Sequence, residues 1–277
     1  MEPNTPQNPY AAPTVDVLSA PLTNDAVSFI PEGRATSFGQ GLNWITRGWN
    51  IFTQSPLIWI VNAVIVLAIY VVLSFIPFIG SILSMVLYAL LGAGMMLGAH
   101  SQHSGRSLEV SDTFSGFQSP HKMNLFILGL LYMVAWTLLL ILAGILVAVI
   151  LGASGVAGAF MSGDSSAIVG LIAGAGIGLI LIGLIVMAVS VPIAMAFWFA
   201  PALVAINGVS PLAALSSSFF ACLKNFLPFL LYGIIFLVLF LVGSIPLLLG
   251  LLVVFPLLFT STYAAYRDIY LADDGNN

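Results

Sequence analysis

The sequence predicts an all-α, polytopic membrane protein with six transmembrane helices arranged as three hairpins, each preceded by a cytoplasmic amphipathic interfacial helix. Of the 277 residues, 60% are apolar and only 6% are charged, whereas about a quarter of a soluble protein is charged. The apolar residues also gather in runs of about 20, the length that crosses the hydrocarbon core of a bilayer. Prolines and short polar stretches separate these runs.

Charge and cysteine content exclude several classes of function. The six Lys and Arg residues are scattered and the formal net charge is −4, so we expect no nucleic acid partner. Cys222 is the single cysteine and cannot form an internal disulfide. Six spans use nearly the whole chain, which leaves no room for a separate catalytic domain.

The termini are expected to lie outside the folded domain at residues 38–271. Residues 1–37 are rich in proline and poor in large apolar side chains, which predicts a disordered cytoplasmic tail. Within it, residues 8–13 resemble an NPYxxP element of small bacterial membrane proteins. This element is either a polar extended linker or a docking peptide for a protein partner. Residues 272–277 form a short acidic end.

A first amphipathic helix is predicted from residue 38 to residue 54. Its apolar stripe recurs at spacings of four and three residues: Phe38, Leu42, Ile45, Trp49 and Phe52. Such a helix is suited to lie in the membrane interface. We expect Trp44 and Trp49 at headgroup depth, and we interpret Arg47 as a third interfacial anchor.

The first hairpin follows a break at Pro56. Two apolar runs, 57–75 and 78–99, are separated by Ile76 and Pro77. Each run is just long enough to span about 30 Å of hydrocarbon. The proline between them predicts a tight turn at the far side of the membrane.

The second unit begins with a polar segment at residues 100–122. It contains a short predicted helix that ends before Pro120. It also contains all three histidines: His100, His103 and His121. Because no cysteine is near and the acidic residues lack ligand spacing, we favour solvated histidines over a metal site.

The second hairpin comprises apolar runs at 124–151 and 167–190, the latter continuing past a kink at Pro192 to about residue 204. Three glycines in the second run are four residues apart, which lets another backbone approach closely. They are Gly170, Gly174 and Gly178.

The third unit starts with a turn at Asn207 and Gly208. Ser210 is predicted to cap a new helix that has Pro211 at its first position. We interpret this segment as a third interfacial helix, with Lys224 anchoring it on the inner side. The last hairpin then comprises two apolar runs, at residues 229–242 and 246–262.

The same order of elements therefore occurs three times, in residues 38–99, 107–204 and 210–262. All six Lys and Arg residues fall on one side of this arrangement, whereas the other side contains Asp164 and two tight turns. The positive-inside rule places that basic side, with both termini, in the cytoplasm.

The predicted spans contain no Asp, Glu, Lys or Arg, which counts against ion-coupled transport and against a metal or carboxylate hydrolase. Asn62, Asn207 and Tyr132 are the candidate intramembrane polar contacts. We favour interhelical hydrogen bonds for them over the lining of a substrate path. No catalytic residue, metal or cofactor is expected.

Four motifs together resemble a family of bacterial multi-pass inner-membrane proteins of unknown function: residues 198–204, the turn at 208–211, the Lys224-Asn225 step before Pro228, and residues 266–270. The resemblance covers residues 38–271 and implies a fold and a location, but no catalytic residue. The chain is distantly similar to the membrane domain of glycerophosphodiester phosphodiesterases. It lacks their hydrolase domain, so that similarity implies no activity.

Two hypotheses for the function follow. The first is a non-enzymatic scaffold or lipid-interacting helper that has membrane lipids as partners and a tail suited to recruiting a protein. The second is a transporter or channel for a small apolar or uncharged solute, in which the kink at Pro192 moves. The oligomeric state stays open.

Overall fold

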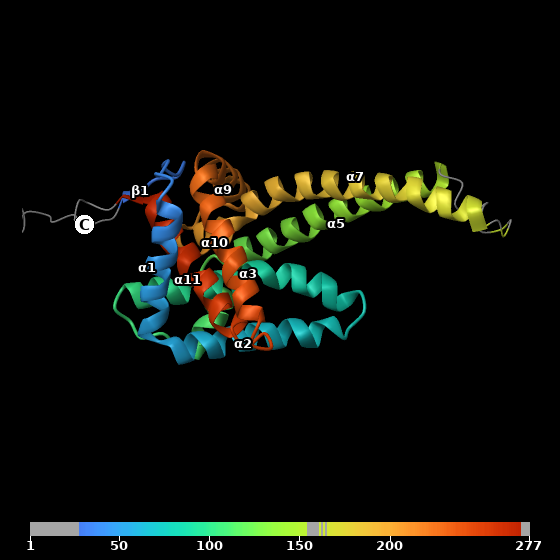
Figure 1. The fold of residues 1–277 in the computed structure, drawn as a ribbon. Coiled ribbons are helices and arrows are strands. Elements are labelled where there is room, and N and C mark those ends of the chain that lie inside the picture. Colours follow the sequence, from blue (N-terminus) through green and yellow to red (C-terminus); the bar gives the residue numbers. More distant parts are fainter. Residues whose placement is uncertain (1–27, 154–160, 162, 164, 273–277) are drawn as a thin grey trace, which may run out of the picture.

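The computed structural model describes residues 28–153, 161, 163 and 165–272, and most of this part is helical (Figure 1). The elements in chain order are β1 (Ser28–Phe29), α1 (Gln40–Gln54), α2 (Pro56–Ser74), α3 (Ile79–His103), η1 (Val110–Phe114), α4 (Ser115–Gln118), α5 (Lys122–Ala153), α7 (Ser165–Trp198), α8 (Ala200–Asn207), α9 (Pro211–Lys224), α10 (Phe226–Ser244), α11 (Leu251–Tyr270) and β2 (Leu271–Ala272).

Helix boundaries follow the proline and glycine signals. Helix α2 begins at Pro56 and α9 begins at Pro211, each at a first-turn position where the missing N–H of proline costs no hydrogen bond. Helix α8 ends at Asn207, and Gly208 follows with φ of +66°, the left-handed conformation common after helices. The predicted turn there is confirmed, although the Ser210 side chain makes no capping hydrogen bond.

Five stretches in the described part of the chain are long and apolar enough to cross a membrane: Pro56–Ser74, Ile79–His103, Lys122–Ile150, Ala175–Asn207 and Phe226–Ser244. The sixth predicted span, at residues 246–262, is not among them. Its helix, α11, starts only at Leu251 and continues through a polar second half that ends at Tyr270.

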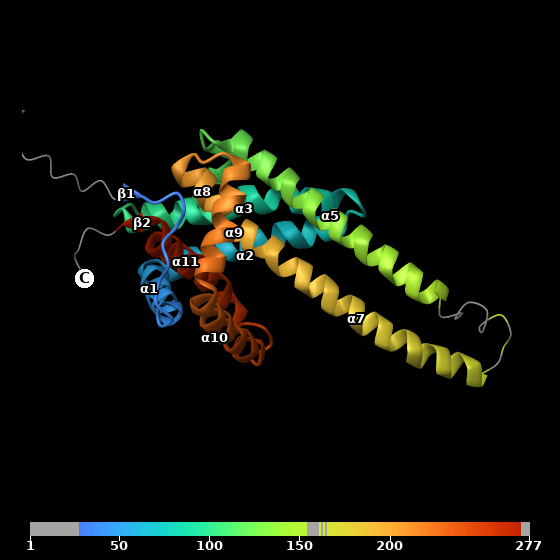
Figure 2. The ribbon, with the colours of Figure 1, turned by 90° about the horizontal axis from the view of Figure 1, so that it is seen from above.

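Helices α5 and α7 form a long pair that projects away from the remaining helices (Figures 1 and 2). They contain 32 and 34 residues, which corresponds to about 48 Å and 51 Å at 1.5 Å per residue. Both exceed a hydrocarbon core of about 30 Å, so in a bilayer they tilt or extend beyond it. Helix α7 passes through Pro192 and ends at Trp198.

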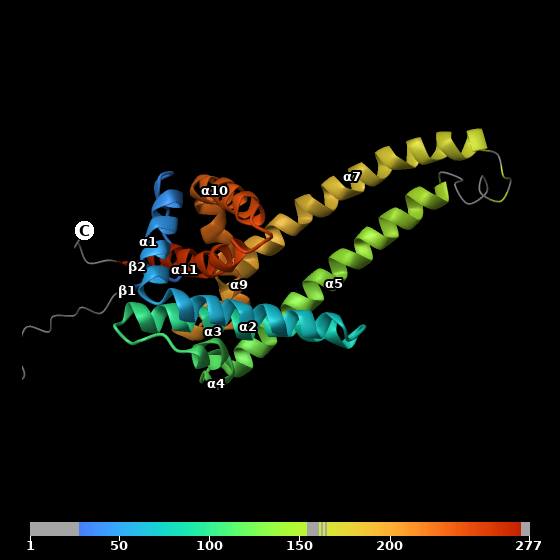
Figure 3. The same ribbon diagram turned by 60° about the horizontal axis from the view of Figure 1, so that its bottom comes forward.

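Helix α11 is the central helix of the compact end of the molecule. It packs against α1, α2, α3 and α10 (Figure 3). From Thr260 to Tyr270 only Arg267 is not buried. The approach to α1 is closest at Gly48, where a Cβ atom would lie 2.5 Å from the backbone N of Ser261. Burial on all sides explains how a partly polar helix fits among apolar ones.

The segment before α1 packs on the C-terminal helix, although we expected residues 1–37 to form a tail. Strand β1 pairs antiparallel with β2, and the backbone N–H of Arg34 donates to the carbonyl of Ile269. The side-chain oxygen of Asn225 accepts hydrogen bonds from Thr36. The NPYxxP element, Asp164 and residues 273–277 lie outside the described residues.

Candidate functional site

Polar side chains of α11 form hydrogen bonds with three other helices. The Tyr266 hydroxyl donates to Asn207 of α8. Ser261 lies 2.8 Å from the hydroxyl of Tyr232 in α10. Asp268 accepts from the indole of Trp44 in α1 at 2.8 Å. Helix α11 therefore links α1, α8 and α10 through hydrogen bonds.

The carboxylate of Asp268 is only 8% exposed and has strong donors on both oxygens. One oxygen accepts from Trp44, and the other lies 2.9 Å from a terminal nitrogen of Arg34. The Nε of Arg34 also donates to the Asp268 backbone carbonyl at 2.5 Å. A buried charge is tolerated when it is paired and hydrogen-bonded in this way.

Three adjoining cavities form what we call the groove, between α2, α3 and α11. Their volumes are about 360, 180 and 180 Å³, and the largest alone is in the range of about 300–1,000 Å³ typical of small-molecule sites. Phe259 of α11 lines all three. Because the α2 and α3 residues around it belong to candidate spans, the groove lies at membrane depth.

The lining of the groove is apolar with a few polar groups. The hydroxyl of Tyr88 donates to the carbonyl of Phe197 at 3.2 Å, and its ring stacks on Tyr132 at 4.3 Å. Trp198 lines the second cavity together with Thr262. The indole N–H of Trp198 is buried and has no hydrogen-bond partner among the described residues. Because that nitrogen has almost no accessible surface, the donor is packed within the protein and is not presented to the cavity.

The groove opens to the outer surface at the third cavity. Leu67 and Phe255 line that cavity and are 49% and 39% exposed. Surface at this depth meets lipid tails in a bilayer. The groove is therefore open at the lateral surface of the molecule.

The three candidate polar residues lie in different places. Asn62 is 1% exposed, and its amide donates to the carbonyl of Glu109 at 3.4 Å. Its oxygen has no partner within the described chain. Asn207 accepts from Tyr266, and Tyr132 lines the largest cavity. Neither asparagine lines the groove.

The apolar stripe of α1 is divided between the core and the surface. Ile45 and Phe52 are buried, whereas Phe38, Leu42 and Trp49 are 45% exposed or more. The two buried residues lie on the helix that packs against α10 and α11. Two of the five stripe residues therefore make protein contacts, and the other three face the surroundings.

The four candidate interfacial anchors differ in exposure and in their contacts. Trp49 and Arg47 are exposed. Trp44 is 0% exposed and its indole donates to the buried Asp268, so it is enclosed by protein, and its depth in the membrane stays a prediction. The exposed Lys224 donates to backbone carbonyls at residues 32 and 33, so it holds the segment before α1.

Of the packing glycines, Gly178 meets α5: a Cβ there would lie 2.7 Å from the side chain of Ile150. The surroundings of Gly170 and Gly174 are outside what the structure describes. The side chain of Cys222 is buried, and burial raises its pKa to about 12. At neutral pH this thiol stays protonated, so it is a poor nucleophile.

Two of the three histidines lie close together: the rings of His100 and His103 both pack against Tyr263, at centroid distances of 6.0 and 6.2 Å. His100 pairs with the Tyr263 hydroxyl at 3.0 Å and His103 contacts Arg267, whereas the ring of His121 lies beside Gly208. Within the described chain no cluster of three or more His, Cys, Asp or Glu residues could hold a metal.

Sequence reasoning missed Phe259, Trp198 and Asp268 as site residues. One signal for Asp268 was present: residues 260–268 interrupt the last apolar run with hydroxyl groups and two charges. A polar stretch at the end of a span indicates a face turned toward protein. No local signal marks Phe259, because the groove exists only where distant helices meet.

The chain is similar to a protein of Burkholderia thailandensis described as a probable inner membrane protein. The two are 29% identical over 250 residues, which cover 83% of this chain and 90% of the relative. No protein-family model matches the chain, and no solved structure matches it. The similarity to glycerophosphodiester phosphodiesterases is not supported by these comparisons. Together with the apolar helices, the relative identifies a multi-pass protein of the bacterial inner membrane.

Proposed function

We propose that this inner-membrane protein is a non-enzymatic, lipid-interacting helper that holds the chain of a membrane lipid in the groove. The observation that carries this proposal is the convergence of three cavities on Phe259 at membrane depth. An apolar lining favours an acyl or isoprenoid chain because such a chain has no polar groups that need hydrogen-bond partners.

The alternative function, transport of a small solute, receives less support. A path for an uncharged polar solute needs hydrated polar groups at membrane depth. The amide of Asn62 donates to Glu109 and the oxygen of Asn207 accepts from Tyr266, and neither side chain lines the groove. We therefore place lipid binding first.

The proposal includes a topology of six crossings. Strands β1 and β2 pair, so the beginning and the end of the described domain lie together. A chain whose two ends share one side of a membrane crosses it an even number of times. With five apolar candidates, α11 supplies the sixth crossing, and its polar half is accommodated because it is buried among the other helices.

This topology predicts the outcome of a reporter scan. A reporter that is active only outside the cytoplasm is expected to be inactive when fused after Lys122, after Lys224 or at the C-terminus, since the basic residues hold these points inside. Fused within residues 154–164, the same reporter is expected to be active. Activity at the C-terminus would contradict the sixth crossing.

A larger side chain placed in the groove is expected to weaken lipid binding. Gly92 lines two of the cavities, and a Cβ there would find its nearest neighbour, Pro201, at 3.9 Å. The side chain of Gly92→Leu would therefore enter the groove without displacing backbone. Native mass spectrometry is expected to show about tenfold weaker retention of lipid, a change equivalent to about 1.4 kcal/mol.

Gly233→Leu is the matched control, because no atom lies within 4 Å of a Cβ at that position. It adds the same side chain to another apolar helix outside the groove. Equal lipid retention by both variants and the wild type would disprove binding in the groove, provided that both variants elute as monodisperse protein.

A further inference from the structure

The largest cavity of the groove, of about 360 Å³, is lined by aromatic rings from four helices, α2, α3, α5 and α11. These rings and two thioether side chains make up most of its wall: Tyr70, Tyr88, Tyr132, Phe259, Met85 and Met95. The rings of Tyr88 and Tyr132 stack with their centroids 4.3 Å apart and their planes at 15°. Aromatic faces and polarisable sulfur atoms make favourable contacts with a planar ring.

Two hydroxyl groups in this wall are available as donors. Within the described chain, no residue accepts a hydrogen bond from Tyr70 or Tyr132. Both residues are half-buried, and neither hydroxyl oxygen is among the enclosed side-chain atoms that lack a partner, so both oxygens are accessible. The indole of Trp136, which lies against Tyr132, is a donor only and cannot take up the hydroxyl proton. The cavity therefore offers one O–H donor from α2 and one from α5.

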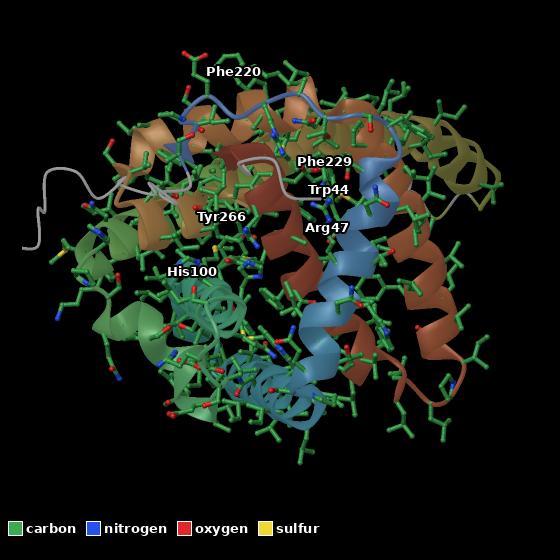
Figure 4. All side chains as sticks on the ribbon, turned by 90° about the vertical axis from the view of Figure 1, so that its left-hand side faces the viewer. Trp44, Arg47, His100, Phe220, Phe229 and Tyr266 are labelled. Carbon is green, nitrogen blue, oxygen red and sulfur yellow. The ribbon has the colours of Figure 1, made fainter. Side chains whose placement is uncertain are left out.

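The groove excludes charged headgroups. Among the described residues, no charged side chain lines any of its three cavities. Charged groups line a different cavity, of about 250 Å³, whose wall includes Arg47 and Asp268 and shares no residue with the groove; Figure 4 shows Arg47 by the ribbon of α1. A phosphate or ammonium group in the groove would be an unpaired charge in apolar surroundings, which is costly. The groove therefore favours a neutral headgroup.

We propose that the largest cavity binds the ring of an isoprenoid quinone, an inference that rests on the proposed lipid-binding function and narrows it to one class of lipid. A quinone ring is planar and neutral, and it has two carbonyl oxygens that accept hydrogen bonds. The hydroxyl groups of Tyr70 and Tyr132 supply two donors. The stacked pair of Tyr88 and Tyr132 supplies aromatic surface for the ring.

The third cavity provides the place for the isoprenoid tail. It shares Val66, Tyr70 and Phe259 with the largest cavity, so the two spaces adjoin along these side chains. The rest of its lining is apolar, and it opens at the lateral surface beside Leu67 and Phe255. A tail attached to the ring therefore passes Phe259 and reaches the lipid. Diacylglycerol is also neutral and has carbonyl acceptors, but it has no ring to stack on the tyrosines.

The test measures binding to the purified full-length protein in a neutral detergent. The probes are a short-chain isoprenoid quinone, the hydrocarbon of the same tail, and diacylglycerol. Dissociation constants come from the rise in unfolding temperature with ligand concentration. We expect the quinone to bind at least about tenfold more tightly than the hydrocarbon or diacylglycerol. In Tyr70→Phe and in Tyr132→Phe the dissociation constant for the quinone is expected to rise about three- to tenfold, since each loses one hydrogen bond and keeps its ring.

Ser84→Ala is the matched control. Ser84 lines the same cavity, but its hydroxyl already donates to the carbonyl of Gly80 at 2.7 Å, so we expect the dissociation constant for the quinone to change less than about twofold. The unfolding temperature without ligand is a second readout. Tyr70→Phe removes a hydroxyl that has no acceptor in the described chain, so this variant is expected to be at least as stable as the wild type.

Equal affinity for the quinone and the hydrocarbon, or equal effects of Tyr70→Phe and Ser84→Ala, would overturn the quinone proposal. Tighter binding of diacylglycerol than of the quinone would also overturn it, and would assign the tyrosine donors to ester carbonyls. The hydrocarbon tests the groove by itself. If Gly92→Leu binds the hydrocarbon as tightly as the wild type does, lipid binding in the groove fails, whereas weaker binding there with no preference for the quinone refutes only the narrower inference.

Discussion

Gly48→Ala is expected to abolish stable folding of the protein. A Cβ at this position would lie 2.5 Å from both the backbone N and the Cα of Ser261. No side-chain rotation can relieve a contact with backbone, so α1 would have to move away from α11. Overpacking costs about 1–3 kcal/mol and occasionally more. We expect a loss at or above the top of that range, because the displaced helix also carries Trp44 and its bond to Asp268.

The measurement is the yield of monodisperse protein in detergent, followed by denaturant unfolding of any folded fraction. Gly233→Ala is the control, since the same substitution in α10 meets nothing within 4 Å. It is expected to be neutral or to stabilise by about 0.5–1 kcal/mol, because alanine is the better helix former. If Gly48→Ala unfolds at the same denaturant concentration as wild type, the close contact between α1 and α11 is not real.

Asp268→Ala is expected to cost about 3 kcal/mol of unfolding free energy. The substitution leaves the buried indole N–H of Trp44 without its acceptor and removes the ion pair to Arg34. An unpaired buried donor costs about 1–3 kcal/mol, and a hydrogen bond to a charged group contributes about 1.5–3 kcal/mol. The side chain of Arg34 is 41% exposed, so water hydrates its guanidinium group and offsets part of the cost of losing the ion pair.

A double-mutant cycle with Trp44→Phe isolates the bond between α1 and α11. Once Asp268 is absent, Trp44→Phe is expected to cost at least about 1 kcal/mol less than it does in the wild type. Lys122→Gln removes an exposed charge elsewhere and is expected to change stability by less than about 0.5 kcal/mol. Strict additivity of Asp268→Ala and Trp44→Phe would contradict the direct contact.

Many helix ends could be predicted because they depend on local chemistry. Pro56 and Pro211 begin helices, and Gly208 follows the end of another, since proline fits the first turn and glycine adopts positive φ. The stretch at residues 199–229 is accordingly a short helix, a turn, a second helix and the first turn of α10. These boundaries need no knowledge of the neighbouring helices.

The candidate site was much less predictable. The preference of tryptophan for the membrane interface suggested Trp44 as an anchor, but it could not show that Asp268, far along the chain, would accept a hydrogen bond from its indole. Phe259 and Trp198 looked like ordinary residues of apolar segments. They form a groove only because α11 packs near α2, α3 and the start of α8.

By itself the sequence determined that the protein resides in a membrane, that it is helical and where many helices start and stop. These properties depend on the hydropathy and the backbone preferences of consecutive residues. Only the tertiary structure decided that α11 is a buried central helix, that residues 28–37 pack against it, and that the groove exists. Each of these results from contacts between residues distant in sequence, and burial in such contacts makes a polar helix compatible with apolar surroundings.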